Sequence, residues 1–199
     1  MRLYVTPTSP YARKVRIALI EKGLPCDIEQ VDLRDPEHAA KEQNPLGKVP
    51  VLVANDGTAI YDSTVILQYL ELMHPQPALF PVDAKERIHA LRLEALADGI
   101  MDATIAWVME HRRSKDCQDP ALLHKQAGKV QSGLAYLQEK ARTWTPATEA
   151  PLPLEQIAAA AAVGYVDLRA PELLVSCADL QRWYLALRSR PSLRETTPQ

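Results

Sequence analysis

The chain opens with short apolar runs that alternate with segments of helical spacing. Residues 3–5 predict a buried strand, and apolar residues then recur every three or four positions from Tyr11 until Gly23 and Pro25 end the pattern. Residues 27–33 alternate polar and apolar side chains, which predicts a strand with one solvated face. Residues 34–42 are polar and predict a short helix or an irregular segment.

A hairpin and a helix follow in the pattern. Proline is confined to strand ends and edges, so residues 50–53 predict a strand that begins at its proline. An Asn-Asp-Gly turn at residues 55–57 leads to a returning strand at 58–60. The next helix is expected over residues 63–73, with Asp62 as its N-cap residue. The order of elements, βαβαββα, is that of a thioredoxin-like α/β domain.

The pattern changes near residue 75. Residues 74–81 hold three prolines and show no periodicity, so residues 76–83 are expected to link a domain at 1–75 to an all-α helical domain at 84–199. The alanine-rich segment at 154–168 is apolar on almost every side and is expected to be a central helix. The other expected elements of this second domain are helices at 84–112, 120–141 and 178–188, a proline-bearing loop at 145–153, and a polar tail with Pro191 and Pro198.

Composition and charge narrow the function classes. The chain has 199 residues and a net charge of −2, which gives no electrostatic reason to expect nucleic acid or an anionic membrane as partner. The early strand leaves no room for a signal peptide, and no apolar run reaches the roughly 18 residues of a membrane span. The three cysteines are scattered and show no zinc-ligand spacing with the histidines. The sequence thus predicts a cytoplasmic globular protein without a metal site.

The most informative stretch is Thr-Ser-Pro-Tyr-Ala-Arg-Lys-Val at residues 8–15. Ser9 lies where the first strand leads into the first helix, and serine at the N-cap with proline at the first helical position is a favoured helix start. Such a start presents free backbone N–H groups and a partial positive charge, which suit an anion. The plain alternative is that Ser9 only caps its helix, because N-cap serines are common.

Ser-Pro-Tyr-Ala resembles the Cys-Pro-Tyr-Cys motif of glutaredoxins with both sulfur atoms replaced. It also resembles the start of zeta-, delta- and theta-type glutathione transferases, in which a serine at this position activates glutathione, and most of all a bacterial branch of that superfamily. Ser9 precedes Val15 by six residues, which matches the zeta-type spacing. The resemblance implies that Ser9 donates a hydrogen bond to the thiolate of glutathione, the cosubstrate. A disulfide reductase would need a nucleophilic sulfur at position 9, and the chain has none there.

The resemblance also implies a glutathione site. A cis peptide bond before Pro50 would leave the main chain of Val49 free to pair with the cysteinyl residue of glutathione. Asp62 and Ser63, at a second helix start, would hold the charges of the γ-glutamyl group. As plain alternatives, Asp62 is a simple N-cap residue and a Val-Pro pair before a strand is ordinary. The residues implied for the glycine carboxylate of glutathione are Lys48 and His38.

The second substrate is expected between the two domains, against the long helix. Three- and four-residue spacing along that helix is equally what a packed helix requires. Asp102 is also a candidate to reach the ammonium group of glutathione across a dimer interface. The candidate pocket residues are Pro10, Tyr11, Asp98, Met101, Asp102, Ile105 and Trp107.

Two further features concern helix starts. Arg13, Lys14 and Arg16 follow Ser9 and could steer anionic glutathione, although charges on an exposed first turn predict a solvated face.

In the family, the later helix usually opens with Ser or Thr and with Asp three residues on. Pro153 and Gln156 stand there in this chain, so this reciprocal cap is expected to be absent.

Together these motifs identify the chain as a member of the soluble glutathione transferases. The implied function is a homodimeric enzyme that joins the sulfur of glutathione to a small hydrophobic electrophile. The alternative from another class is a non-catalytic glutathione-transferase-like module for protein contacts, against which the intact Ser9 and Val49 count. No motif identifies the electrophile, or decides between conjugation, isomerisation, dehalogenation and peroxide reduction.

Overall fold

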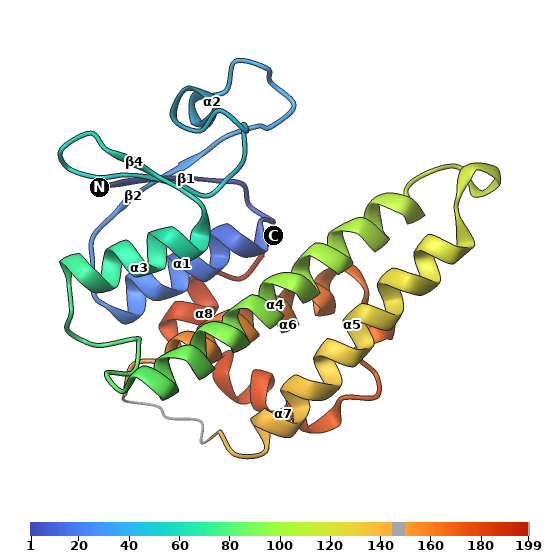
Figure 1. The fold of residues 1–199 in the computed structure, drawn as a ribbon. Helices are drawn as coiled ribbons and strands as arrows, with labels where there is room; N and C mark the ends of the chain where they lie inside the picture. Colours follow the sequence, from blue (N-terminus) through green and yellow to red (C-terminus); the bar gives the residue numbers. More distant parts are fainter. Residues whose placement is uncertain (145–149, 199) are drawn as a thin grey trace.

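A computed structural model describes residues 1–144 and 150–198 of the chain. A four-stranded sheet with its helices is followed by a bundle of helices (Figure 1). The sheet order is β2-β1-β3-β4, with β1 parallel to β2 and antiparallel to β3, and β3 antiparallel to β4. This topology confirms the predicted thioredoxin-like fold. The strands are β1 (Arg2–Val5), β2 (Asp27–Gln30), β3 (Val51–Val53) and β4 (Ala59–Ile60).

Three helices cover the two faces of the sheet. They are α1 (Pro10–Glu21), α2 (Ala39–Gln43) and α3 (Ser63–Met73). α1 and α3 lie on one face and α2 on the other (Figure 1). The side chains of β1 alternate, so Leu3 and Val5 join the core with α1 and α3, whereas Tyr4 packs with Ala40 of α2.

β2 differs from its prediction. The strand ends at Gln30 instead of continuing to residue 33, and three of its four residues are exposed. Ile28 is 43% exposed because β2 is an edge strand that pairs only with β1. The alternation of polar and apolar residues therefore predicted the strand correctly, but it did not predict that the apolar side chain of Ile28 is exposed.

The C-terminal part is all-helical, as predicted. α6 lies at its centre and packs against α1, α4 and α7. From Leu154 to Val166 every residue of α6 except Glu155 is buried, which confirms that the alanine-rich helix is central. The helices are α4 (Ala84–His111), α5 (Pro120–Ala141), α6 (Leu154–Arg169), α7 (Ala178–Leu187) and α8 (Pro191–Glu195), with 3-10 turns η1 (Lys115–Cys117) and η2 (Pro171–Leu173).

Two glycines allow close contacts between helices. A Cβ atom on Gly133 of α5 would lie 2.6 Å from Cγ1 of Ile100 on α4. A Cβ atom on Gly164 of α6 would overlap the guanidinium of Arg13 and the hydroxyl of Tyr184. Both positions therefore require glycine because there is no room for a side chain.

The C-terminus corrects one prediction. The residues expected to form a polar tail contain α8, which packs against α1. Leu193 is buried, and Nη2 of Arg190 lies 2.7 Å from Oε2 of Glu21. Ser192 also donates a hydrogen bond to Glu21. A helix of one turn carries too few apolar residues to produce a periodic signal.

The proline-rich segment after α3 is held by buried polar contacts. Nζ of Lys22 lies 2.7 Å from Oε2 of Glu71 and donates hydrogen bonds to the carbonyls of His74 and Pro77. Glu71 in turn accepts a hydrogen bond from the N–H of Leu79. The segment is therefore fixed to α1 and α3 as it leads into α4.

Four further expectations concern the loop before α6, the start of α6, membrane spans and metal sites. Of the loop predicted at 145–153, residues 145–149 lie outside the described residues. No side-chain cap precedes α6, which begins after Pro153, and this confirms the predicted absence of the reciprocal cap. In residues 1–144 and 150–198, no helix is long and apolar enough to cross a membrane. The same residues contain no group of three or more His, Cys, Asp or Glu side chains that could hold a metal ion.

Candidate active site

Ser9 is the N-cap residue of α1. Its Oγ accepts a hydrogen bond from the N–H of Ala12 at 3.2 Å, and Pro10 occupies the first helical position. This contact uses a lone pair of Oγ and leaves the hydroxyl hydrogen free to donate to an anion. The half-buried side chain lines a cleft of about 670 Å³ between the sheet domain and α4. Capping the helix and donating to a ligand are therefore compatible roles for Ser9.

The loop before β3 forms the second wall of the cleft. The peptide bond between Val49 and Pro50 is cis, as the resemblance predicts. Within the described part of the chain, the N–H and C=O of Val49 have no hydrogen-bond partner. The side-chain amide of Asn44 donates to the carbonyl of Lys48 and accepts from the N–H of Leu46, both at 3.0 Å, which holds this loop. An extended peptide can therefore pair with the main chain of Val49.

The start of α3 forms the third wall. Oδ1 of Asp62 accepts hydrogen bonds from the N–H groups of Thr64 at 3.1 Å and Val65 at 3.5 Å, which confirms its N-cap role. Ser63 occupies the first helical position, and both Asp62 and Ser63 line the cleft. The positive end of the α3 dipole therefore faces the same space as that of α1.

The cleft brings together most of the site residues predicted from the sequence. They come from the start of α1, the loop before β3, the start of α3 and one face of α4. The residues are Ser9, Pro10, Tyr11, Lys48, Val49, Pro50, Asp62, Ser63, Asp98, Asp102 and Ile105.

Three predicted residues do not line the cleft. Met101 is fully buried in the core, because neighbours on a helix point about 100° apart and Asp102 already faces the cleft. Trp107 packs against the ring of His111, with ring centroids 3.8 Å apart. His38 is buried, and its Nδ1 has no hydrogen-bond partner among the described residues.

The basic residues of α1 correct the prediction of a solvated face. Arg13 and Lys14 are buried and Arg16 is half-buried. Arg13 donates to the hydroxyl of Tyr184 at 3.1 Å and to the carbonyl of Leu193 at 3.5 Å, so it joins α1 to α7 and α8. None of the three basic residues lines the cleft.

Lys14 is the centre of a buried ion cluster. Its Nζ lies 2.8 Å from Oε1 of Glu94 and 2.8 Å from each carboxylate oxygen of Asp98. The hydroxyl of Thr64 lies 3.2 Å from Oε1 of Glu94 and 3.3 Å from Oδ2 of Asp98. The cluster joins α1, α3 and α4 directly behind the cleft, and Asp98 is the member that lines it.

Two phenols and one carboxylate line the cleft on the side formed by α1, α4 and α6. The hydroxyl of Tyr11 donates a hydrogen bond to Oδ1 of Asp102. Burial, together with this bond and the charge of Asp102, raises the pKa of Tyr11, and burial raises the pKa of Tyr165. Both phenols therefore stay protonated at neutral pH.

Sequence reasoning missed several lining residues. Met109 lies seven positions after Asp102 and four after Ile105, so helical spacing would have found it. Tyr165 comes from α6, where the apolar pattern gives no sign that one side chain reaches the cleft. The lining residues that were missed are Thr6, Thr8, Leu33, Asn44, Leu46, Tyr61, Met109 and Tyr165.

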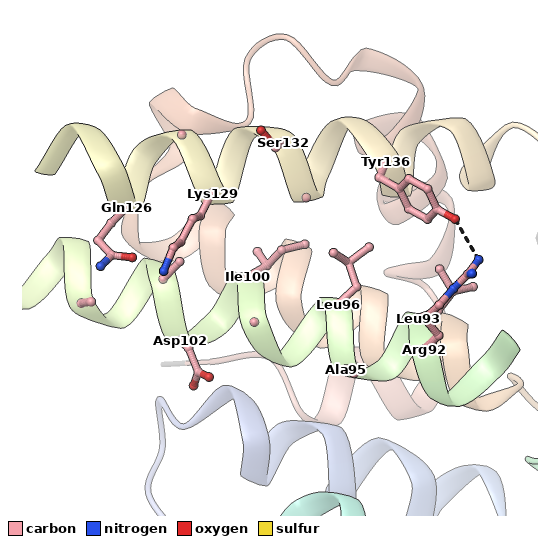
Figure 2. Close-up of a pocket in the computed structure, with 15 residues that line it drawn as sticks. Arg92, Leu93, Ala95, Leu96, Ile100, Asp102, Gln126, Lys129, Ser132 and Tyr136 are labelled. Carbon is pink, nitrogen blue, oxygen red and sulfur yellow. Dashed lines mark hydrogen bonds between the residues drawn. The ribbon is translucent and has the colours of Figure 1, made fainter. Parts of the chain in front are cut away.

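A second cavity, of about 1170 Å³, lies between α4 and α5 (Figure 2). Apolar and small side chains of both helices line most of it, and at one end Arg92 donates a hydrogen bond of 3.1 Å to the hydroxyl of Tyr136. Asp102 borders this cavity as well as the cleft, but Figure 2 shows its side chain leaving α4 on the side away from α5. Apart from Asp102, the residues predicted for the glutathione site do not line this cavity.

Comparison with known proteins agrees with this geometry. Residues 3–78 match the family model of the glutathione S-transferase N-terminal domain. The chain is 38% identical over 200 aligned positions to the uncharacterized GST-like protein YibF of Escherichia coli K12, covering 100% of this chain and 98% of YibF. The protein therefore belongs to the glutathione S-transferase family.

Two solved structures are similar over almost the whole length. A glutathione S-transferase of Methylobacillus flagellatus KT with glutathione bound is 40% identical, with a TM-score of 0.91, covering 100% of this chain and 99% of that one. One of Methylobacterium radiotolerans, in complex with glutathione sulfonate, is 38% identical with a TM-score of 0.88, covering 99% and 94% of the two chains. Both similarities extend through the helical domain as well as the sheet domain.

Proposed function

We propose that this protein is a serine-type glutathione transferase in which the Ser9 hydroxyl stabilises the glutathione thiolate for attack on a small hydrophobic electrophile. The observation that carries the proposal is the hydrogen bonding of Ser9. Its Oγ accepts from the N–H of Ala12, so the hydroxyl hydrogen remains available, at the start of a helix and inside the cleft. Two similar structures that hold glutathione or its sulfonate support the choice of ligand.

The energies are sufficient for this role. A free thiol has a pKa of about 8.5, and lowering it by roughly two units requires about 2.7 kcal/mol of preference for the thiolate. A hydrogen bond to a charged group contributes about 1.5–3 kcal/mol, and a helix N-terminus adds about 0.3–1 kcal/mol. One hydroxyl at the start of α1 therefore accounts for the required shift.

The other walls of the cleft would orient glutathione. The free N–H and C=O of Val49 pair with the cysteinyl main chain, beside the cis bond to Pro50. Ser63 and the start of α3 take the γ-glutamyl carboxylate, while the second oxygen of Asp62 attracts the neighbouring ammonium. Lys48 is the cation available for the glycine carboxylate.

The chemical step is a nucleophilic substitution or addition. The thiol proton passes to water, and the thiolate sulfur forms a bond to the electrophilic carbon. In a substitution the leaving group departs with its bonding electron pair, and in an addition the π electron pair moves to the neighbouring atom, which takes a proton from water. The protein contributes by holding sulfur and carbon together in a cleft with apolar walls at its far end. We expect the enzyme to be a cytoplasmic homodimer.

Replacing Ser9 by alanine tests the proposal. In the Ser9→Ala variant we expect the dissociation constant of glutathione to change by less than about threefold, while the pKa seen in the pH profile of kcat/KM rises by about two units. Calorimetry measures the first quantity, and initial rates with an activated aryl chloride measure the second. The Asp119→Ala variant is the matched control, because it removes the N-cap side chain of α5, which does not line the cleft.

The outcomes separate the two function classes. An unchanged pH–rate profile in Ser9→Ala would remove Ser9 from the mechanism. Retention of the wild-type protein on immobilised glutathione without turnover of any electrophile would instead favour the non-catalytic protein-contact module.

A further inference from the structure

We propose that Asp102 selects the second substrate, so that the cleft prefers electrophiles carrying a positive charge beside an apolar reactive group and discriminates against anionic ones. This inference rests on the proposed transferase function and assigns a substrate class to the electrophile end of the same cleft. It depends on how charge is distributed along the walls of the cleft.

The carboxylate of Asp102 is held in place with one oxygen unused. Oδ1 accepts the hydrogen bond from the hydroxyl of Tyr11, and no hydrogen bond to Oδ2 occurs among the described residues. The side chain is exposed to solvent and leaves α4 toward α1, away from α5 (Figure 2). Asp102 is thus an oriented anion with a free acceptor in the cleft.

The remaining charges of the cleft do not neutralise Asp102. Lys48 is the one cation among the described lining residues, and it belongs to the loop beside Val49 at the glutathione end. Asp98 is paired with Lys14, but that lysine also faces Glu94, so the three groups together carry one negative charge. Binding of glutathione as its thiolate adds further negative charge next to the site of attack.

The rest of the electrophile end is apolar or neutral. Pro10, Ile105 and Met109 supply apolar surface, and the phenols of Tyr11 and Tyr165 are uncharged at neutral pH, with burial raising the pKa of each further above it. The cations that act on Tyr165 are Arg112 and Arg169, and neither lines the cleft.

This arrangement favours one class of electrophile. A flat apolar ring fits against Tyr11, Ile105 and Tyr165, where ring contacts and burial of apolar surface favour binding. A positive charge on that ring can approach the free oxygen of Asp102, and the attraction between the two opposite charges favours its binding. An anionic substituent would meet repulsion from Asp102 and from the thiolate, with no lining cation left to compensate it.

The test uses three activated aryl chlorides that differ only in the substituent opposite the chlorine: a carboxylate, a methyl ester, or a trimethylammonium-methyl group. In each reaction the glutathione sulfur bonds to the ring carbon, chloride leaves with the electron pair of the C–Cl bond, and the thiol proton passes to water. The measured quantity is the ratio of kcat/KM for the cationic chloride to that for the anionic one, each corrected for its uncatalysed rate.

We expect the wild-type ratio to exceed one, and to fall by about tenfold in Asp102→Asn, a change of about 1.4 kcal/mol. The rate with the methyl ester should stay within about twofold, since this substitution keeps the shape of the side chain and removes only its charge. Raising the ionic strength should lower the ratio in the wild type more than in Asp102→Asn. Tyr11→Phe keeps the carboxylate and should keep a ratio above one.

Asp116→Asn is the matched control, because it changes the net charge by the same amount at an exposed residue outside the cleft, and its ratio should equal that of the wild type. Turnover of all three chlorides with the same ratio in the wild type and in Asp102→Asn would overturn this inference alone. Absence of turnover with every chloride would overturn the transferase proposal, and this inference with it.

Discussion

Two hydroxyl groups at the start of α1 face the cleft with opposite hydrogen bonding. Oγ of Ser9 accepts from a backbone N–H and keeps its own hydrogen available, whereas the hydroxyl of Tyr11 gives its hydrogen to Asp102. A thiolate can only accept hydrogen bonds, so the group that stabilises it must have a hydrogen to donate. Of these two residues, Ser9 meets that requirement, and Tyr11 serves to orient Asp102.

The raised pKa of Tyr11 predicts a loss of stability at alkaline pH. In the unfolded chain a tyrosine releases its proton at about pH 10, whereas folded Tyr11 keeps its proton at that pH. The stabilisation is therefore fully present below that pH and is lost as the pH rises through the folded pKa. Between about pH 8 and about pH 11, the free energy of unfolding should decrease more in the wild type than in Tyr11→Phe.

Urea unfolding at a series of pH values measures this difference. Tyr136→Phe is the control, because it removes a phenol that lies outside the cleft and accepts a hydrogen bond from Arg92. Parallel pH curves for the wild type and Tyr11→Phe would contradict the assignment of a raised pKa to Tyr11.

At the scale of elements, α6 lacks the side-chain cap that α1, α3, α4 and α5 have. Asp62, Asp83 and Asp119 cap α3, α4 and α5, but Pro153 precedes α6 and offers no acceptor side chain. The backbone of Pro153 has φ −70° and ψ 160°, which is the extended conformation typical of an N-cap residue. A serine at this position could therefore cap α6 without a change of the main chain.

We expect Pro153→Ser to be more stable than Pro153→Ala by about 1 kcal/mol, because the serine hydroxyl can accept from a free N–H at the start of α6. The comparison with alanine is needed since both variants lose the rigidity of proline, which itself stabilises by about 0.4–1 kcal/mol. Thermal or urea unfolding of the pair measures the difference. Equal stabilities would show that the start of α6 is already satisfied by other contacts.

The sequence was sufficient to predict most helices and strands, but it was not sufficient to predict the charged contacts between them. Apolar spacing predicted α4, α5 and α6 because long helices repeat the signal over several turns. α8 and the exposed face of β2 were missed, because short elements and edge strands depend on what lies beside them. Lys14 was expected on the surface, since nothing in its neighbours in sequence reveals that Glu94 and Asp98 meet it eighty residues later.

The residues of the candidate site also divide into those that the sequence predicts and those that it does not. Ser9, Val49 and Asp62 could be found because each belongs to a local motif at the end of a strand or the start of a helix. Tyr165 lies on the apolar helix α6 and nevertheless lines the cleft. Met101 does not line the cleft, because its neighbour Asp102 occupies the side of α4 that faces it. Those two outcomes depend on helix packing, which a single sequence does not specify.

At the scale of the whole molecule, buried polar contacts of α1 join the two domains. Arg13 reaches α7 and α8, Lys14 reaches α4, and Glu21 pairs with Arg190 before α8. Burying a charge is costly unless partners surround it, so each of these contacts restricts how the helical domain sits on the sheet domain. The width of the cleft between the domains depends on the same contacts, because Asp98 belongs both to the cluster and to the cleft.

Lys14→Met should therefore destabilise the protein by about 3–5 kcal/mol, because it leaves the buried carboxylate of Glu94 and the half-buried one of Asp98 without their cation. Lys85→Met makes the same change at an exposed lysine and should alter the stability by less than about 0.5 kcal/mol. The triple variant Lys14→Met, Glu94→Gln, Asp98→Asn removes the unpaired charges and should recover much of the loss.

Urea unfolding followed by tryptophan fluorescence and by circular dichroism measures these differences. Tryptophan occurs only in the helical domain, at positions 107, 144 and 183, while the dichroism signal comes from both domains. Because the cluster joins the domains, we expect the two transitions to coincide in the wild type and to separate in Lys14→Met. Coincident transitions with a loss below about 1 kcal/mol would mean that the two carboxylates find water or other partners, and that the domains are held together mainly by the apolar contact of α1 with α6.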